Sequence, residues 1–493
     1  MVGALLAGRV APALVLTDAG GAARRGESPL MKVSEPRTLV THPELRSHHS
    51  LPVFKTLGEE PKSPLEKLLS LFADVRAGEG VGALLLALNV FLLLGGYSLM
   101  KPARDGLILT EGGAELASYS AAAQAVLLMV VVPFYGWLGT RVVRIRLISI
   151  MMTFFAVTLI GFYIGGRIGL REGVAFYIWI GLINVFIVSQ FWAFANDLYT
   201  EGQGRRLFPL IGVGQSLGAW VGAAAVTPLV QGLNYTPYTL MLLGACVLIV
   251  ALLITLVVNR HETARADPDA VKADVVPLGP EGGFELVMKD RYLLWIAVLI
   301  VLLNVVNTTG GYVLNKLIVA EAAGRFGTDP AAVAESRQFI TAFSGSIIAT
   351  VNLVGFLLQL FVTSRVIRFL GVRGALFILP ALALINYSII AVAPILAVVR
   401  IGKILENSTD YSIQNTLRQA LFLPTSREAK YKAKAAIDTF FTRAGDVISA
   451  GFVGLGQVIG VSTPVFAGLN VVLTGAWLWV AGQIAREHRK KTL

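Results

Sequence analysis

The sequence predicts an all-α integral membrane protein whose twelve transmembrane helices form two parallel repeats of six. Three observations predict this fold. Of the 493 residues, 55% are hydrophobic and only 15% are charged, whereas about 25% are charged in an average soluble chain. Twelve apolar stretches have the roughly 20 residues needed to cross ~30 Å of hydrocarbon. A polar motif of the first stretch recurs in the seventh. A water-soluble globular fold is therefore excluded.

The predicted spans divide into two sets of six on either side of a charged segment. The first six cover 81–102, 115–138, 144–166, 172–195, 207–231 and 237–259. The second six cover 292–315, 338–363, 373–393, 395–419, 434–459 and 464–484. The tenth is the most polar, and its helical periodicity supports it more than its hydropathy does.

The remaining segments complete the predicted domain organisation. Residues 1–75 mix Pro, Gly, Ser and charge without an apolar period, so we expect a mostly disordered tail, in which Met31 is an alternative start and no export peptide stands out. The predicted parts of the remaining chain are a six-helix bundle at 76–259, a linker at 260–290, a second bundle at 291–485 and a basic tail at 486–493.

The net charge of +11 lies mainly in alternate loops. Basic residues follow predicted spans 2, 4, 6, 8, 10 and 12, whereas the loops after spans 5, 9 and 11 have neither Lys nor Arg. Because basic loops stay in the cytoplasm, we expect both termini and the linker to be cytoplasmic, in a bacterial inner membrane. This charge needs no nucleic-acid partner.

The two halves are related by an internal repeat. Residues 88–101 and 303–316 share eight identities at a constant offset of 215, including Asn89 with Asn304 and Lys101 with Lys316. Asn and Lys are costly within a membrane span, so a chance match is disfavoured. An even number of spans separates the copies, and they therefore have the same orientation. Such parallel repeats are typical of major-facilitator transporters, which bind substrate between their halves.

Ionisable residues inside the spans point to an anionic substrate. Each costs about 2.5–3.5 kcal/mol to insert and therefore needs a partner or a function. Arg and Lys bind phosphate and carboxylate groups, and polar residues of the tenth span lie on one helical face. The predicted substrate-binding residues are Lys101, Arg104, Asn307, Lys316, Arg400, Lys403, Asp410, Gln414 and Arg418. The open alternative is mutual neutralisation, as of Arg104 by Asp105 or of Lys403 by Glu406.

Charges at the span ends suggest gates. Asp197 is expected to pair with Arg205 or Arg206 at the cytoplasmic side, and Asp410 or Glu406 is expected to act as a switching residue. Asp438, Arg443 and Asp446 are candidates for a similar gate, for which pairing among themselves is the default interpretation. Gly214, Gly218 and Gly222 repeat every four residues, which predicts close helix packing and not phosphate binding.

Enzymatic chemistry has no support in the sequence. A single cysteine excludes a disulfide framework or a Cys-based metal cluster, and the five histidines lie in predicted tails or loops. We find no phosphate-binding loop, nucleophile elbow or metal-spaced His pair, so we predict no cofactor, no metal and no enzyme activity.

The chain resembles the ATP/ADP translocase family of intracellular bacteria and plastids along its predicted spans. The matching segments are Tyr97–Asp105, Phe191–Gly214 and Tyr411–Asp438. The resemblance implies nucleotide exchange and functional basic positions at Arg104 and Arg418. It also marks departures from the family, because Ile180, Asn307 and Gln419 stand at positions where the family has acidic residues.

The sequence thus predicts a transporter that moves an anionic, phosphorylated metabolite by alternating access, with a nucleotide such as ATP or ADP favoured by the resemblance. Two alternatives stay open. One is a proton-linked transporter of a non-nucleotide organic anion. The other is a membrane scaffold or receptor that has kept the fold, for which degenerate polar residues between the halves would be expected.

Overall fold

A computed structural model describes residues 62–70, 73–139, 141–263 and 282–492, and every regular element in this described part is a helix. The first half contains α1 (Pro64–Leu69), α2 (Gly80–Gly139), α3 (Arg144–Arg167), α4 (Gly173–Leu198), α5 (Glu201–Thr227), η1 (Pro228–Gly232) and α6 (Pro237–Thr263). The second half opens with α7 (Gly283–Lys289), α8 (Arg291–Phe326), η2 (Pro330–Ala332), α9 (Val333–Phe361), α10 (Thr363–Ala375) and α11 (Ile378–Val392). It continues with α12 (Leu396–Thr409), η3 (Asp410–Gln414), α13 (Asn415–Ala420), η4 (Ala429–Ala433), α14 (Lys434–Ala436), η5 (Ile437–Phe441), α15 (Thr442–Ile459) and α16 (Thr463–Thr492).

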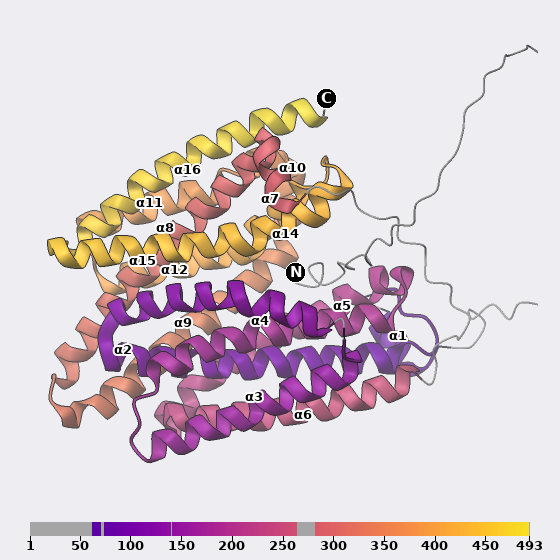
Figure 1. The fold of residues 1–493 in the computed structure, drawn as a ribbon, viewed down its shortest axis with the longest axis horizontal. Helices are drawn as coiled ribbons and strands as arrows, with labels where there is room; N and C mark the ends of the chain where they lie inside the picture. Colours follow the sequence, from indigo (N-terminus) through magenta and orange to yellow (C-terminus); the bar gives the residue numbers. More distant parts are fainter. Residues whose placement is uncertain (1–61, 71–72, 140, 264–281, 493) are drawn as a thin grey trace, which may run out of the picture.

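Helix α2 contains the first two predicted spans, 81–102 and 115–138. Its backbone leaves helical geometry at Gly112 and Gly113, and Gly113 has φ +69°. Only glycine adopts this left-handed region at little cost, so the pair lets the chain reverse direction without a longer loop. Figure 1 shows α2 folding back at this break.

Eight helices of the described residues are long and apolar enough to cross a membrane: α2, α3, α4, α5 with η1, α6, α8, α9 with η2, and α16. A ninth candidate is the pair α10 and α11, bent by 76°. This finding establishes a multi-pass membrane protein with an all-helical described part. The predicted number of twelve spans is not established, because two predicted spans are merged in α2 and those at 395–419 and 434–459 are interrupted by π-helical turns.

Two large apolar cores lie in the described helices. The first core contains residues from the helices α2 through α6, such as Leu159 and Ile183. The second core contains residues from the helices α8 through α16, such as Tyr292 and Trp477. Figure 1 shows the two sets of helices as separate layers, indigo to pink and orange to yellow. Residues 108–117 of α2 belong to the second core and Ala342 of α9 to the first, so these two helices connect the layers.

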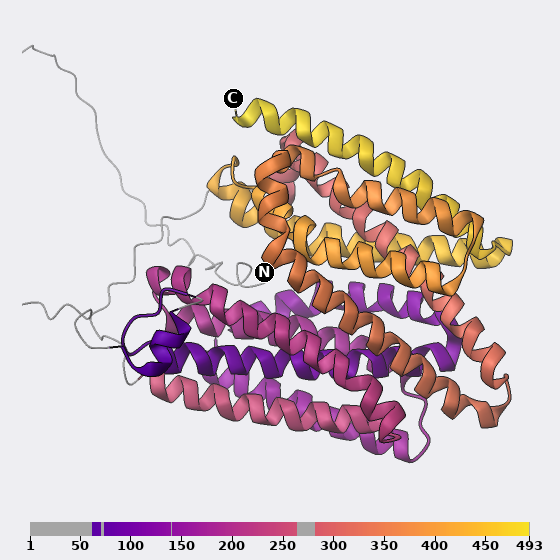
Figure 2. The same ribbon diagram turned by 180° about the vertical axis from the view of Figure 1, so that it is seen from behind.

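The layers meet along α2 with α15 and α5 with α9. Figure 2 shows α9 from behind, running beside the helices of the first half. The glycine stripe of α5 packs inside the first half, against α2. A Cβ atom on Gly214, Gly218 or Gly222 would lie within 2.4 Å of a carbonyl oxygen of α2. The predicted packing role of these glycines is confirmed.

The chain segments outside the large helices are only partly described. Residues 1–61 of the predicted tail and 264–281 of the predicted linker lie outside the described residues. Where the tail is described, it contains α1, so the expected disorder does not extend to residues 64–69. Ser63 and Glu66 form a capping box, and Glu66 also accepts the N–H of Gly78 at 2.6 Å, which fixes this helix against the start of α2.

Candidate functional site

A cavity of about 390 Å³ lies between the two halves and brings together four of the charged residues singled out from the sequence, Lys101, Arg104, Lys403 and Arg443. This volume lies within the range of small-molecule sites. Helices α2 and α4 line it from the first half, and α8, α9, α12, η3 and α15 from the second. Its charged lining residues are Lys101, Arg104, Asp105, Lys403, Arg443 and Asp446. Uncharged polar lining residues include Tyr97, Gln124, Tyr177, Asn184, Asn307, Thr308, Asn315, Asn407 and Tyr411.

Helix α2 contributes two cations on one face, Lys101 and Arg104. Arg104 donates from Nε and Nη2 to Asp105 Oδ1 at 2.9 and 2.7 Å, and its guanidinium stacks 4.3 Å from the ring of Tyr177. Lys101 has neither an ion pair nor a hydrogen bond with any described residue. A cation without a partner in a polar cavity is a ready point charge for an anionic ligand.

Helix α12 contributes Lys403, which is 3% exposed in its side chain. Its Nζ donates to Glu406 Oε1 at 3.1 Å and to Asn307 Oδ1 at 2.6 Å. Tyr387 of α11 donates to the other oxygen of Glu406 at 2.9 Å. The predicted neutralisation of Lys403 by Glu406 is therefore present, with Asn307 holding the ammonium at the cavity wall.

Helix α15 adds a third pair at the cavity. Arg443 Nη1 lies 3.3 Å from Asp446 Oδ2, and Thr308 of α8 donates to Asp446 Oδ1 at 2.9 Å. Arg443 was expected at a cytoplasmic gate, whereas the structure places it in the cavity lining. Asp438, another predicted member of that gate, pairs instead with Lys434. Lys434 lies in α14, one turn earlier, and Asp438 lies in η5, the π-helix that leads into α15.

Lys316 lies beside the cavity in an ion pair that joins the two halves. Its Nζ donates to Glu115 Oε1 of α2 at 2.6 Å, and Tyr312 Oη donates to the same oxygen at 2.9 Å. Gln457 of α15 donates to it as well. Glu115 follows the break in α2, at the end of the molecule opposite the C-terminus of α16 (Figure 1). This cluster links α2 to α8 and α15 across the contact between the halves.

Four other predicted binding residues do not line the cavity. Arg400 donates to Ser346 at 3.2 Å and stacks on Phe343, while Asp410, Gln414 and Arg418 lie further along α12 to α13. Asp410 and Gln414 are at most 9% exposed. The prediction assumed a regular α-helix through this region. Asp410–Gln414 is instead a π-helix, whose turn takes about one more residue, and within it Tyr411 lines the cavity in place of Asp410 and Gln414.

The ion pairs at the end of α4 also differ from those predicted for a gate there. Asp197 pairs with Arg144 at 2.9 Å, and Arg206 pairs with Glu79 at 2.7 Å. The side chain of Arg205 lies outside the described residues. Arg206 is drawn to Glu79 because this carboxylate precedes α2 and faces the first turns of α5, which pack closely on α2.

Sequence analysis did not identify Glu115, Tyr177 or Asn184 as site residues. Asn184 is the single amide in the apolar run 173–188, and Glu115 is one of the two acidic residues that flank the Gly112–Gly113 break, the other being Glu111. Both signals were available in the sequence. Tyr177 gives no such signal, because an aromatic residue in a span is ordinary and its position under Arg104 depends on tertiary packing.

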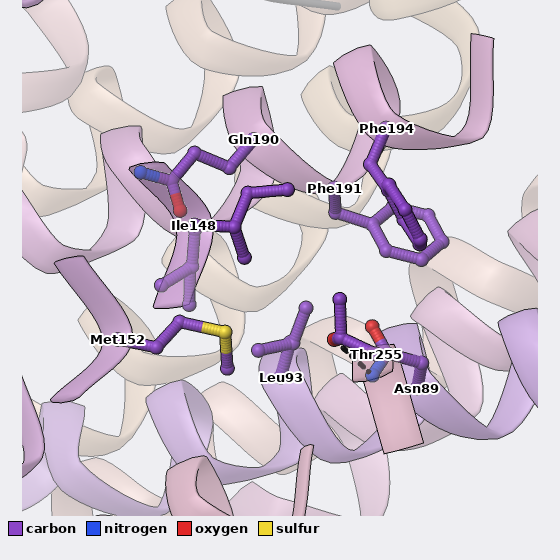
Figure 3. A pocket seen from close by; sticks show the side chains of 9 residues that line it. Asn89, Leu93, Ile148, Met152, Gln190, Phe191, Phe194 and Thr255 are labelled. Carbon is purple, nitrogen blue, oxygen red and sulfur yellow. Dashed lines mark hydrogen bonds between the residues drawn. The ribbon is translucent and has the colours of Figure 1, made fainter. Parts of the chain in front are cut away.

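A second, much smaller cavity lies inside the first half. Its volume is about 10 Å³, close to that of one water probe, and its lining is mostly apolar. Figure 3 shows Asn89 and Thr255 hydrogen-bonded at one end and Met152, Leu93 and Ile148 around the rest. A space of this size fits a packing defect or one water, not a metabolite.

Together, these observations define the class of protein: a multi-pass, all-helical membrane protein with a polar cavity between its two halves. Solved structures support the fold. A peptide transporter in complex with sulfate matches with a TM-score of 0.57 and 14% identity, over 85% of this chain and 99% of that one. The nucleoside transporter NupG matches with a TM-score of 0.52 and 15% identity, over 81% and 98%.

The chain belongs to the TLC ATP/ADP transporter family, whose model matches residues 174–488. The similarity to ADP,ATP carrier protein 1 of Chlamydia muridarum is 23% identity over 86% of this chain and 91% of that protein. ADP,ATP carrier protein 1 of Rickettsia bellii is 22% identical over 82% of this chain and 92% of its own length. The resemblance inferred from the sequence motifs is therefore confirmed, as is the prediction of a transporter and not an enzyme.

Proposed function

We propose that this protein is a secondary transporter that moves a phosphorylated, nucleotide-type anion across the inner membrane by alternating access. The observation that carries the proposal is the cavity between the halves, where Lys101, Arg104, Lys403 and Arg443 meet. Cations in a partly dehydrated site bind phosphate oxygens through charge-assisted hydrogen bonds. The names of the family and of its relatives favour a nucleotide, with exchange as the mode of transport.

The uncharged lining suits the rest of a nucleotide. Amides of Asn184 and Asn315 and hydroxyls of Tyr97 and Tyr411 can donate to or accept from a base or ribose. Tyrosine rings also provide faces on which a base stacks. The proposed division of labour is therefore phosphate at the cations and nucleoside at the amides and rings.

The proposed movement is rocking of one half against the other. The Glu115–Lys316 pair, with Tyr312 and Gln457, would hold the outer side closed and would separate when that side opens. Glu406, bound to Lys403, and Asp410, buried farther along the same span, are the proposed switching residues. Phosphate arriving at Lys403 would compete with the Glu406 carboxylate.

The finer topology is part of the same proposal. Twelve spans result if α2 counts as two at its break and if α12 to α13 and α14 to α15 each cross the membrane. Two bundles, 76–259 and 291–485, are supported by the two apolar cores. Cytoplasmic termini are supported by the basic loops, and α1 lies at the same end of the molecule as the C-terminus (Figure 1).

Proton-linked transport of a non-nucleotide organic anion is the second candidate. The observation that favours it is the presence of carboxylates at the site, namely Asp105, Glu406 and Asp446, which could carry a proton. Dependence of uptake on a pH gradient, with no competition from nucleotides, would select this candidate.

The decisive test is uptake of labelled nucleotides into proteoliposomes that contain the purified full chain. We expect uptake to accelerate when the vesicles are preloaded with unlabelled nucleotide. Arg104→Ala and Lys403→Ala in the cavity lining, and Arg418→Ala at the basic position that the family resemblance implies to be functional, are expected to impair uptake without loss of expression. Lys490→Ala on the exposed end of α16 is the matched control. Folded protein that neither takes up nor exchanges any nucleotide would refute the substrate class. Wild-type rates in all three variants would refute the basic site.

A further inference from the structure

The charges around the cavity are nearly balanced, and this balance bears on how many phosphates its ligand carries. We propose that the site prefers a substrate of low charge, a nucleoside monophosphate or another phosphate monoester, over nucleoside di- and triphosphates. The inference rests on the proposed function, since it assumes that a phosphorylated nucleotide-type anion enters this cavity.

The net charge of the groups at the cavity is small, although four cations line it. Four cations line the cavity, and two carboxylates, Asp105 and Asp446, line it with them. A third carboxylate, Glu406, lies directly behind Lys403. With these groups ionised, four cations against three carboxylates leave one positive charge, so most of the positive field is already cancelled inside the protein.

Each of the three carboxylates is committed to its own cation. Asp105 holds Arg104 at 2.7 Å, Glu406 holds Lys403 at 3.1 Å and Asp446 holds Arg443 at 3.3 Å. A ligand phosphate that claims one of these cations leaves the carboxylate uncompensated, and removing one partner from a buried pair is strongly unfavourable. Every additional phosphate must therefore either share a paired cation with its carboxylate or displace that carboxylate.

Lys101 is the cavity cation that is available without this penalty, because it has no ion pair or hydrogen bond within the described parts of the chain. A phosphate monoester carries a charge of about −1.5 to −2 and three acceptor oxygens. One ammonium, the unshared N–H groups of Arg104 and neutral donors such as Asn315 can satisfy such a group. The cavity volume does not discriminate between nucleotides, so charge is the property expected to decide.

Competition in proteoliposomes tests the inference. Vesicles with the purified full chain are preloaded with AMP, and uptake of labelled AMP is measured against unlabelled AMP, ADP, ATP and uncharged adenosine, without divalent cations. We expect the concentration of ATP that halves AMP uptake to be about tenfold higher than the concentration of unlabelled AMP that does so. ADP is expected to lie between the two.

Two variants should reverse the preference. Asp105→Asn and Asp446→Asn keep the shape of the side chain but each release one arginine from its carboxylate. We expect ATP to gain about tenfold relative to AMP in either variant. The matched control is Asp290→Asn, which removes an exposed ion pair to Lys491 far from the cavity and should leave the order of nucleotides unchanged.

The outcomes separate this inference from the function on which it rests. Equal or tighter competition by ATP in the wild-type protein overturns the low-charge preference and leaves nucleotide transport standing. No uptake and no competition by any nucleotide, in protein that is monodisperse after purification, overturns both. If the Asp variants do not fold, the order of AMP, ADP and ATP in the wild-type protein alone decides the inference.

Discussion

The repeated segments 88–101 and 303–316 have the same letters at eight positions and different surroundings. In the first copy, Lys101 faces the cavity without an ion partner, and in the second, Lys316 is bound to Glu115. Asn89 reaches across to α6, whereas Asn304 bonds to its own helix. The two halves thus share a scaffold, while the preserved lysines have different contacts: Lys101 lines the cavity, and Lys316 joins the two halves through Glu115.

The largest effect is expected from removing the two lysines of this repeat. Lys101→Ala deletes the unpaired cation, and loss of a hydrogen bond to a charged group costs about 2–3 kcal/mol, or roughly 30- to 150-fold in kcat/KM for the anion. Lys316→Ala removes a cation that is already paired with Glu115, and we expect a loss smaller than tenfold. Initial uptake rates over a range of substrate concentrations measure both. Equal losses in the two variants would refute the division of roles between the copies.

The two adjacent glycines of the second copy, Gly310 and Gly311, differ in how tightly they are packed. A Cβ on Gly310 would lie 1.8 Å from the hydroxyl of Tyr387, whereas a Cβ on Gly311 meets no atom within 4 Å and Gly311 lines the cavity. Overpacking of a core costs about 1–3 kcal/mol. We expect Gly310→Ala to lower the thermal midpoint in detergent and Gly311→Ala to leave it unchanged. A midpoint that falls equally in Gly311→Ala would show that this position is more tightly packed than the structure indicates.

The sequence was sufficient for the parts of the fold that depend on composition and local pattern. Apolar stretches located the large helices, and the glycine spacing of α5 correctly predicted its packing on α2. Lys101, Arg104, Asn307 and Lys403 were predicted to bind the substrate because charge within a span is costly, and the structure places all four in the lining of one cavity.

The rest of the site depended on features that a helical period cannot show. The π-turn at Asp410–Gln414 changes which residues share a face, and it removed Gln414 and Arg418 from the predicted cavity lining. Glu115 is distant in sequence from Lys316, so only the packing of α2 against α8 reveals their contact. Ion pairs between helices were therefore the least predictable part, as the pairing of Arg206 with Glu79 also shows.

A smaller effect distinguishes the two asparagines of the repeat. Asn89 donates to the Ala251 carbonyl at 2.7 Å and to Thr255 at 2.9 Å, and it joins α2 to α6. Side-chain hydrogen bonds between membrane helices contribute about 0.6 kcal/mol on average and up to about 1.7. We expect Asn89→Ala to destabilise the protein by about 1 kcal/mol. Asn304→Ala removes only a bond to the Ile300 carbonyl in the same helix, and its effect should be near zero. Unfolding in detergent with increasing denaturant compares the two, and a larger loss in Asn304→Ala would contradict the assignment.

The smallest effect concerns the acidic residues that precede α2 and α8. Glu79 pairs with Arg206 and is 13% exposed, whereas Asp290 pairs with Lys491 and is 34% exposed. Burial acts to raise the pKa of Glu79, but hydrogen bonds from Arg206 and from the backbone of Arg76 outweigh it and lower the pKa below 4.5. A lowered pKa in the folded state stabilises the protein at pH values above the unfolded pKa. This contribution disappears as the pH falls through the folded value.

We therefore expect the difference in stability between wild type and Glu79→Gln to be below about 1 kcal/mol at neutral pH and to shrink in acid, because the pair is partly exposed and screened by solvent. Asp290→Asn should show a still smaller difference, since asparagine can cap α8 as aspartate does. Thermal midpoints measured from neutral pH downward check both variants. A Glu79→Gln protein whose deficit grows as the pH falls would have the opposite sign and would refute the proposed anchoring of α2 by this carboxylate.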